Sequence, residues 1–182
     1  RPSGSLTIGI FFGGGSLDPQ LASGSGFSAQ GATIFDTLMY VDAKNKAQPS
    51  IAEKWDISSD GMVHTLKIRQ GVKFHDGSPL TGADVKFSIE RQLEPKSIHQ
   101  DAVSWRATIA GVDLKDDYTI VIRMKTPRFE LLKGAGFGGM GAVVPKKYIE
   151  EKGVDYFGTH PIGSGSWKLV KPWGLLLLRA LV

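Results

Sequence analysis

Two pairs of extended runs, each joined by an acidic turn, restrict the fold of this 182-residue chain more than any other feature of its sequence. The first pair, Trp55 to Ser58 and Val63 to Arg69, flanks an Asp-Gly step, which is a strong signal for a β-hairpin. The second pair, Gly111 to Leu114 and Tyr118 to Lys125, is joined by a Lys-Asp-Asp turn. The second run of each pair has a period of two: Leu66 and Ile68 share one face of the first, and Ile120, Ile122 and Met124 share one face of the second. The pattern predicts two antiparallel hairpins.

A helix is predicted between the two hairpins. Thr81 and Asp84 have the spacing of a capping box, in which two side chains satisfy the free N–H groups at a helix start. Apolar residues then recur every four positions at Val85, Ile89 and Leu93, and Pro95 ends the helix. The order hairpin, helix, hairpin predicts an α+β fold in which a helix packs on one face of an antiparallel sheet.

The first third of the chain gives weaker patterns. Leu6 to Phe11 is apolar and predicts a short opening strand, and Ser16 to Pro19 predicts a turn. In the run from Ala32 to Tyr40, apolar side chains recur at helical spacing, which predicts a helix there.

Composition excludes several classes of protein. Hydrophobic residues make up 41% of the chain and charged residues 22%, which is typical of a globular domain. The net charge of +4 is small, and no Lys/Arg run exceeds two residues, so no nucleic-acid partner is expected. Cysteine is absent, which excludes a disulfide scaffold and thiolate chemistry. No stretch approaches the roughly 18 apolar residues of a membrane span, and no signal sequence is recognised at the start of the chain.

Motifs that would indicate an enzyme are either absent or lie between the wrong kinds of predicted element. Gly134 to Gly139 satisfies G-x-G-x-x-G, but the preceding residues are typical of a helix and the following ones of an extended segment, the reverse of a dinucleotide site. No G-x-S-x-G occurs, and the histidines form neither an H-E-x-x-H motif nor a pair four residues apart. We therefore expect no catalytic residue, no metal site and no cofactor.

The middle of the chain resembles a known family. The run from Gln48 to Leu93 is similar to the signature region of the family 5 extracellular solute-binding proteins, the peptide/nickel group of ABC-importer receptors. The resemblance is carried by ordered segments in this region and beyond it: Ser16 to Pro19, Pro49 to Trp55, Ser59 to Gly61, Thr65 to Arg69, Gly71 to Gly77, Leu80 to Val85, Phe87 and Ser88, Val143 to Tyr148 and Pro161 to Gly165.

The resemblance implies an incomplete periplasmic-binding-protein type II-like fold. Members of the family are much longer and close two lobes on a ligand. In that comparison, residues 1–45 form the start of lobe I, residues 46–160 the inserted small α+β domain with its return segment, and residues 161–182 the return to lobe I. The likeness ends near Lys171, and the following residues are almost wholly apolar. A frameshifted or truncated end is the favoured interpretation, and a short apolar strand or helix is the alternative.

The same resemblance implies a function. The chain is expected to be the substrate-binding component of an ABC importer, which captures a small solute, with a peptide favoured, and delivers it to a membrane permease. It implies a periplasmic or extracellular location, compatible with a lipid anchor on the source protein. Self-association through the surface of the missing lobe is also expected. The alternative is a stand-alone protein-interaction or chaperone-like domain derived from the same fold.

The resemblance makes six residues candidates for contact with the solute. Phe27 and Trp105 fall near ligand-facing positions of the family, and the segment from Phe137 to Met140 lies where the chain returns from the small domain toward the cleft. Gly residues after the first strand allow a ligand to approach the backbone, although a plain turn would also use them. The aromatic candidates compete with the alternative that they are ordinary core residues. The candidates are Gly13, Gly15, Phe27, Trp105, Phe137 and Met140.

Overall fold

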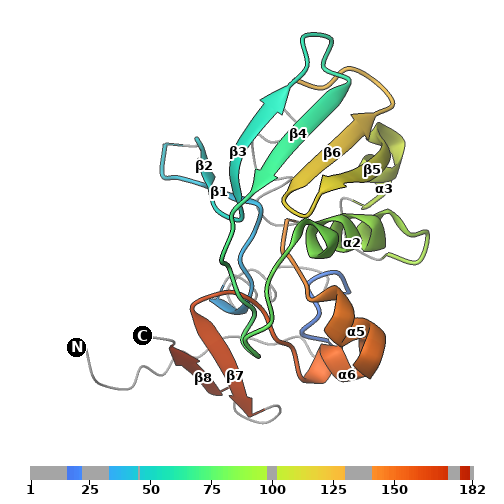
Figure 1. The fold of residues 1–182 in the computed structure, drawn as a ribbon. Coiled ribbons are helices and arrows are strands. Elements are labelled where there is room, and N and C mark those ends of the chain that lie inside the picture. Colours follow the sequence, from blue (N-terminus) through green and yellow to red (C-terminus); the bar gives the residue numbers. More distant parts are fainter. Residues whose placement is uncertain are drawn as a thin grey trace.

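The computed structural model describes residues 16–21, 33–44, 46–97, 102–129, 141–171 and 177–180, with only the backbone described at 171 and 177–180. Within these residues the elements follow one another as β1 (Met39–Val41), β2 (Ala47–Pro49), β3 (Ala52–Ile57), β4 (Val63–Ile68), α2 (Gly82–Leu93), α3 (Ala102–Thr108), β5 (Ile109–Asp116), β6 (Thr119–Met124), α5 (Lys146–Lys152), α6 (Val154–Thr159), β7 (Trp167–Lys171) and β8 (Leu177–Ala180). Figure 1 shows the long strands at one end of the molecule and α5 and α6 at the other, with α2 between them.

The two predicted hairpins are confirmed, and they combine into one antiparallel sheet of order β3-β4-β6-β5. The first turn is built as its Asp-Gly step predicts. The Asp60 carboxylate accepts the N–H of Met62 at 3.0 Å, and Gly61 takes a positive φ of 69°. A side chain at this φ would be strained. The second turn is closed by Asp116, which accepts the N–H of Tyr118 at 2.9 Å.

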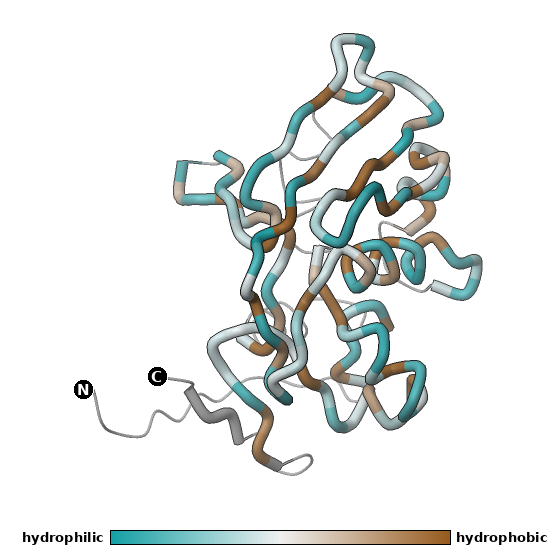
Figure 2. Tube along the Cα trace, in the orientation of Figure 1, coloured by the Kyte–Doolittle hydropathy of each residue, from teal (hydrophilic) through white to brown (hydrophobic). Residues whose placement is uncertain are grey.

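One face of this sheet forms the main hydrophobic core. The strand register places Leu66 opposite both Trp55 on β3 and Ile120 on β6, so these side chains share the inner face. Helices α2 and α3 cover that face, and they contribute Val85, Ile89 and Trp105 to the core. Buried and more exposed residues alternate along β4, as expected for a strand with one buried face, whereas β6 carries a continuous apolar stretch from Ile120 to Ile122 (Figure 2).

Helix α2 begins where the sequence predicts. Thr81 is its N-cap, and the Asp84 carboxylate accepts both the backbone N–H of Thr81, at 2.9 Å, and its hydroxyl, at 3.0 Å. The other carboxylate oxygen of Asp84 accepts the N–H of Lys146 at 3.0 Å. The predicted cap therefore also fixes the start of α5, which is distant in the sequence.

The helix predicted over Ala32 to Tyr40 is wrong. Among its described residues, 33–40, only 33 and 34 are helical, and the run ends in β1. The cause is that this run supplies two different cores. Ile34 packs with the smaller core near α5 and α6, whereas Leu38 packs with the core of the sheet. A helix would place residues four apart on the same face, so an extended chain is required to reach both cores.

The smaller core contains Phe157 and Ile149, which come from α6 and α5, and Ile34, Phe35, Ala142 and Val144 complete it. The rings of Phe35 and Phe157 meet edge to face, with centroids 6.0 Å apart. The chain then continues into β7, which pairs antiparallel with β8. No helix among the described residues is long and apolar enough to cross a membrane. The predicted opening strand and the G-x-G-x-x-G segment lie outside the described residues.

We expect Leu66→Ala to lower the free energy of unfolding by about 2–5 kcal/mol, because it leaves a cavity in a well-packed core. Leu66 is 0% exposed at the centre of the sheet, whereas Leu114, on β5 of the same sheet, is 39% exposed. Leu114→Ala removes the same atoms and is the matched control, with an expected loss below about 1.5 kcal/mol. Urea denaturation followed by tryptophan fluorescence measures both. Equal losses would contradict the assignment of the buried face.

Candidate ligand-binding region

The structure describes only one of the six candidate residues. Trp105 lies on α3 with its side chain 4% exposed, in the core between α3 and the sheet. Its role as a ligand-facing residue stays a prediction. Gly13, Gly15, Phe27, Phe137 and Met140 lie outside the described residues.

Segments near those candidates in the sequence are described. Ser16 directly follows Gly15, and Gly141 directly follows Met140. The described segments are 16–21, 33–38 and 141–144.

A buried ion pair holds segment 16–21 against α2. The guanidinium of Arg91 donates to Asp18 through Nη2 at 2.7 Å and through Nη1 at 3.4 Å, one nitrogen to each carboxylate oxygen. The Asp18 side chain is 0% exposed and that of Arg91 10%. The same carboxylate accepts the N–H of Gln20 at 2.9 Å, and Leu17 donates its N–H to Gly158 on α6 at 2.7 Å. Segment 16–21 is thus bound on two sides.

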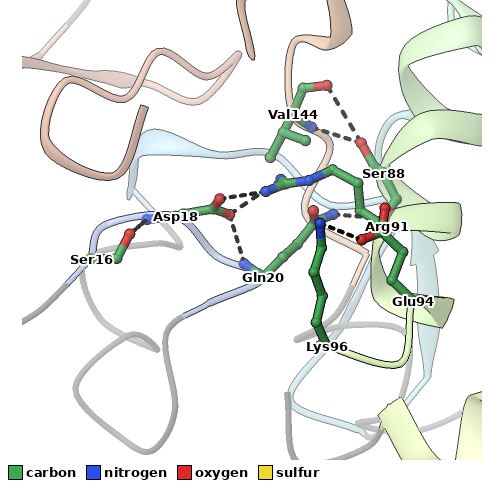
Figure 3. A network of polar contacts seen from close by, with 8 residues as sticks. All are labelled: Ser16, Asp18, Gln20, Ser88, Arg91, Glu94, Lys96 and Val144. Atoms are coloured by element: carbon green, nitrogen blue, oxygen red, sulfur yellow. Dashed lines mark hydrogen bonds and ion pairs between the residues drawn. The ribbon is translucent and has the colours of Figure 1, made fainter. Parts of the chain in front are cut away.

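Ser88 on α2 joins this segment to segment 141–144 (Figure 3). The side-chain amide of Gln20 donates to the backbone carbonyl of Ser88 at 2.6 Å. The hydroxyl oxygen of Ser88 accepts the N–H of Val144 at 2.9 Å. One turn of α2 therefore contacts both segments.

Segments 33–38 and 141–144 lie side by side. Leu38 donates its N–H to Gly141 at 3.0 Å, and Val143 donates to Asp36 at 3.1 Å. Thr37 and Ala142 form an antiparallel bridge between these two hydrogen bonds. Segments 16–21, 33–38 and 141–144 therefore converge beside α2, and the first and last of them directly follow Gly15 and Met140 in the sequence. The spacing of these segments in the sequence could not reveal this.

A second polar anchor holds segment 33–38 from the other side. The Nδ1 of His75 accepts the N–H of Gly163 at 3.3 Å, and its Nε2 lies 2.8 Å from the carbonyl oxygen of Gly165. Because a carbonyl can only accept, Nε2 carries the ring proton. Gly165 also donates its N–H to Ile34 at 2.9 Å. A Cβ built on Gly163 would overlap the carbonyl oxygen of Ile34, so only glycine fits this crossing.

The carboxyl of Asp36 lies within this anchor. Burial raises its pKa above the ordinary value, and the neighbouring Ser164 and His75 partly offset that effect. Because its pKa is raised, the Asp36 carboxyl is harder to ionise in the folded protein than in the unfolded chain. Its ionisation therefore disfavours folding increasingly as pH rises from the ordinary pKa to the folded pKa.

A third contact, between His64 and Arg128, holds the chain before the segment that contains Phe137 and Met140. The Nε2 of His64 lies 2.7 Å from the carbonyl oxygen of Arg128, so Nε2 carries the proton. The Nδ1 of His64 is buried and has no hydrogen-bond partner among the described residues. Burial lowers the pKa of His64, and the backbone carbonyls of Arg128 and Gly61 partly offset it.

The polar side chains of this region hold backbone segments in place. In the described part of the chain, no group of three or more His, Asp or Glu residues lies close enough to hold a metal ion. The polar side chains of the three anchors bind backbone groups or one another. The pairings of His75 and Arg91 could not be predicted from the sequence, because their partners are distant in the sequence and leave no local pattern.

Comparison with known proteins agrees with the resemblance noted in the sequence. Residues 46–174 match the family described as bacterial extracellular solute-binding proteins, family 5 Middle. The chain belongs to this family. The match covers α2, the four-stranded sheet and the side chains of His75 and Arg91, whereas Asp18, the partner of Arg91, lies before it.

Relatives in the family include binding proteins for a small peptide. The chain is 30% identical over 155 residues to the glutathione-binding protein GsiB of Pectobacterium atrosepticum, and 29% identical over 153 residues to that of Salmonella typhi. These alignments cover 85% and 84% of this chain but only 30% and 29% of the relatives. The chain thus spans about three tenths of the length of these family 5 members, which are named as binding proteins and not as enzymes.

Solved structures show the same fold, that of periplasmic binding proteins of type II. DppA of Helicobacter pylori, in complex with the peptide STSA, is 25% identical with a TM-score of 0.77, over 92% of this chain and 37% of that one. NikZ of Campylobacter jejuni, in complex with Ni(L-His), is 26% identical with a TM-score of 0.76, over 96% and 34%. AppA of Bacillus subtilis, at 24% identity and a TM-score of 0.82 over 98% and 36%, supports the fold alone.

The close approach of Gly163 to the backbone of Ile34 predicts that one added methyl group destabilises the protein. We expect Gly163→Ala to lower the free energy of unfolding by about 1–3 kcal/mol or more, because the new Cβ meets rigid backbone. Gly111→Ala is the control, since its Cβ would meet only the end of the Arg123 side chain, which can move. Its expected effect is within about 1 kcal/mol in either direction. Chemical denaturation measures both, and a neutral Gly163→Ala would contradict the close packing.

His64 predicts a dependence of stability on pH. Its folded pKa lies below the ordinary value of 6.5, so the unfolded chain binds the proton first as pH falls. The contribution of neutral His64 to the free energy of unfolding is complete above pH 6.5. It declines as pH falls below that value, by at most about 1.4 kcal/mol per pH unit. The His64→Gln variant keeps an N–H donor but does not titrate in this range.

The test compares the free energies of unfolding of wild type and His64→Gln between pH 8 and pH 5. The difference between the two proteins is expected to be constant from pH 8 to pH 7 and to move in favour of the variant below pH 6.5. A difference that stays constant over the whole range would show that burial does not shift this histidine.

Proposed function

We propose that this chain forms part of the substrate-binding component of an ABC importer, which captures a small solute and delivers it to a membrane permease. The observation that carries the proposal is the family match over residues 46–174. The convergence of segments 16–21, 33–38 and 141–144 beside α2 supports it, because those segments adjoin the candidate solute contacts.

A peptide is the favoured solute. Glutathione is the named ligand of the relatives, and DppA holds the peptide STSA. The mechanism is binding without chemistry, in which the ligand stabilises a closed arrangement of two lobes because it binds that arrangement more tightly. We place Gly13 and Gly15 against the ligand backbone, and Phe27, Trp105, Phe137 and Met140 against its side chains. Since the chain spans about three tenths of its relatives, we propose that the rest of the site lies on further sequence.

The division of the chain follows from the same proposal. Residues 1–45 and 161–182 are assigned to lobe I and residues 46–160 to the inserted small domain. The four-stranded sheet with α2 and α3 lies within the second range, and Leu38 and Met39 from the first range complete its core. We assign the protein to the periplasm or the outer surface of a bacterium, with a lipid anchor as its proposed attachment.

We also propose that the chain by itself self-associates. Large apolar side chains are exposed on several elements, among them Tyr40, Val103, Phe129 and Val170. Surfaces of this kind are commonly covered by another part of a longer protein or by a second copy.

The test is a chimera in which residues 16–171 of this chain replace the matching segment of GsiB from Pectobacterium atrosepticum. Isothermal titration calorimetry with glutathione, with the peptide Ser-Thr-Ser-Ala and with Ni(L-His) measures binding, and GsiB itself is the control. We expect the chimera to bind at least one of the two peptides. The 182-residue chain alone is expected to bind them with dissociation constants above about 1 mM.

A folded chimera that binds neither peptide nor the nickel complex would contradict the proposed function, and circular dichroism and thermal unfolding establish that it is folded. If the chimera binds only Ni(L-His), the proposed function as a receptor is kept, and the favoured solute changes from a peptide to a nickel complex. Micromolar binding of a peptide by the chain alone would contradict the proposal that the site extends beyond it.

A further inference from the structure

We infer that Arg91 is a positioning residue for the solute site, acting through Asp18 on segment 16–21. The functional consequence of this inference rests on the proposed function, but the positioning itself is a property of the described residues. Arg91 lies 73 positions from Asp18 in the sequence, and Nη2 of its guanidinium lies 2.7 Å from Oδ2 of Asp18.

The ion pair is not required to attach α2 to the sheet. Helix α2 packs on the sheet through Val85 and Ile89, both of which belong to the main core. Arg91 instead contacts Asp18 and the ring of Phe87 on its own helix, which lies 5.6 Å from the guanidinium carbon. Removing both charges from water is costly, and apolar side chains of similar volume often stabilise a fold as well or better.

The geometry of the pair serves orientation. The two guanidinium nitrogens address the two carboxylate oxygens, and this fork fixes the direction of the carboxylate as well as its distance. Asp18 in turn closes the turn that follows it, since its Oδ1 accepts the N–H of Gln20 and its backbone carbonyl accepts the N–H of Leu21. The position of Arg91 is therefore transmitted to the backbone of segment 16–21.

That segment adjoins a candidate contact on the solute. Ser16 directly follows Gly15 in the sequence, so segment 16–21 leads directly from a residue that we propose to contact the solute. Gln20 reaches Ser88, and Ser88 reaches Val144, so a displacement of segment 16–21 would also weaken the link to segment 141–144. A positioning role for Arg91 thus affects two sides of the proposed site from one helix.

Hydrogen exchange of the complete 182-residue chain, followed by mass spectrometry, tests the positioning role without any ligand. The variants are Arg91→Ala, Arg91→Lys and Asp18→Asn. We expect Arg91→Ala and Asp18→Asn to raise the exchange rate of amides in segment 16–21 about tenfold or more, while amides in β4 and β6 change by less than about threefold. Arg91→Lys keeps the charge without the fork, so its increase is expected to be intermediate.

The control is Arg123→Ala, which removes another arginine–aspartate pair, that of Arg123 with Asp113 on the exposed side of the sheet. It is expected to leave segment 16–21 unchanged. Equal increases in segment 16–21 and in β4 and β6 would mean that Arg91 is only a general stabilising residue, and this result would overturn the inference. An unchanged segment 16–21 in Arg91→Ala would overturn it as well. If Arg91→Ala does not fold, Arg91→Lys and Asp18→Asn decide by the same criteria.

A second measurement separates this inference from the proposed function. In the chimera with GsiB, Arg91→Lys is expected to raise the dissociation constant of the bound peptide about tenfold or more, and the Arg123→Ala chimera to leave it unchanged. A local effect on exchange in a chimera that binds no solute would sustain the positioning role and contradict the function. Peptide binding that Arg91→Lys leaves unchanged would sustain the function and contradict the role of Arg91 in the site.

Discussion

The structure depends on helix α2 having two faces with different partners. One face places Val85 and Ile89 in the core of the sheet, where burial of apolar surface supplies the main driving force for folding. The other presents polar groups that bind residues distant in the sequence. Ser88 contacts the Gln20 side chain and the Val144 backbone, Arg91 contacts the Asp18 carboxylate, and the cap residue Asp84 contacts the Lys146 backbone. Without the apolar face, the polar groups would have no fixed positions from which to act.

The polar contacts organise what the apolar core cannot specify. Hydrophobic packing tolerates small displacements, whereas a forked ion pair or a buried hydrogen bond is lost when its partners shift. The Asp18–Arg91 pair and the His75 contacts with Gly163 and Gly165 hold short segments that carry few apolar residues of their own. A receptor that closes on a solute needs such segments held in one conformation, because every residue ordered on binding lowers affinity.

Much of the fold could be predicted from local pattern, and the site could not. Both hairpins and the start of α2 follow from the Asp60-Gly61 step, the alternation along β4 and β6, and the Thr81–Asp84 cap, all of which act within a few residues. Helix α5 was not predicted, although Lys146 and Lys147 pair with Glu150 and Glu151 at helical spacing. The convergence of segments 16–21, 33–38 and 141–144 depends on contacts between residues far apart, for which a single sequence holds no signal.

The sequence by itself therefore determined the sheet, its covering helix and the resemblance to family 5 solute-binding proteins, since these depend on residue order and short-range chemistry. The tertiary structure decided that the chain after Ile34 is not helical, because Ile34 and Leu38 belong to different cores. It also decided that Arg91 is the partner of Asp18 and that His75 binds the segment around Gly163. Those pairings depend on the tertiary structure, because side chains so far apart in the sequence come within bonding distance only in the folded chain.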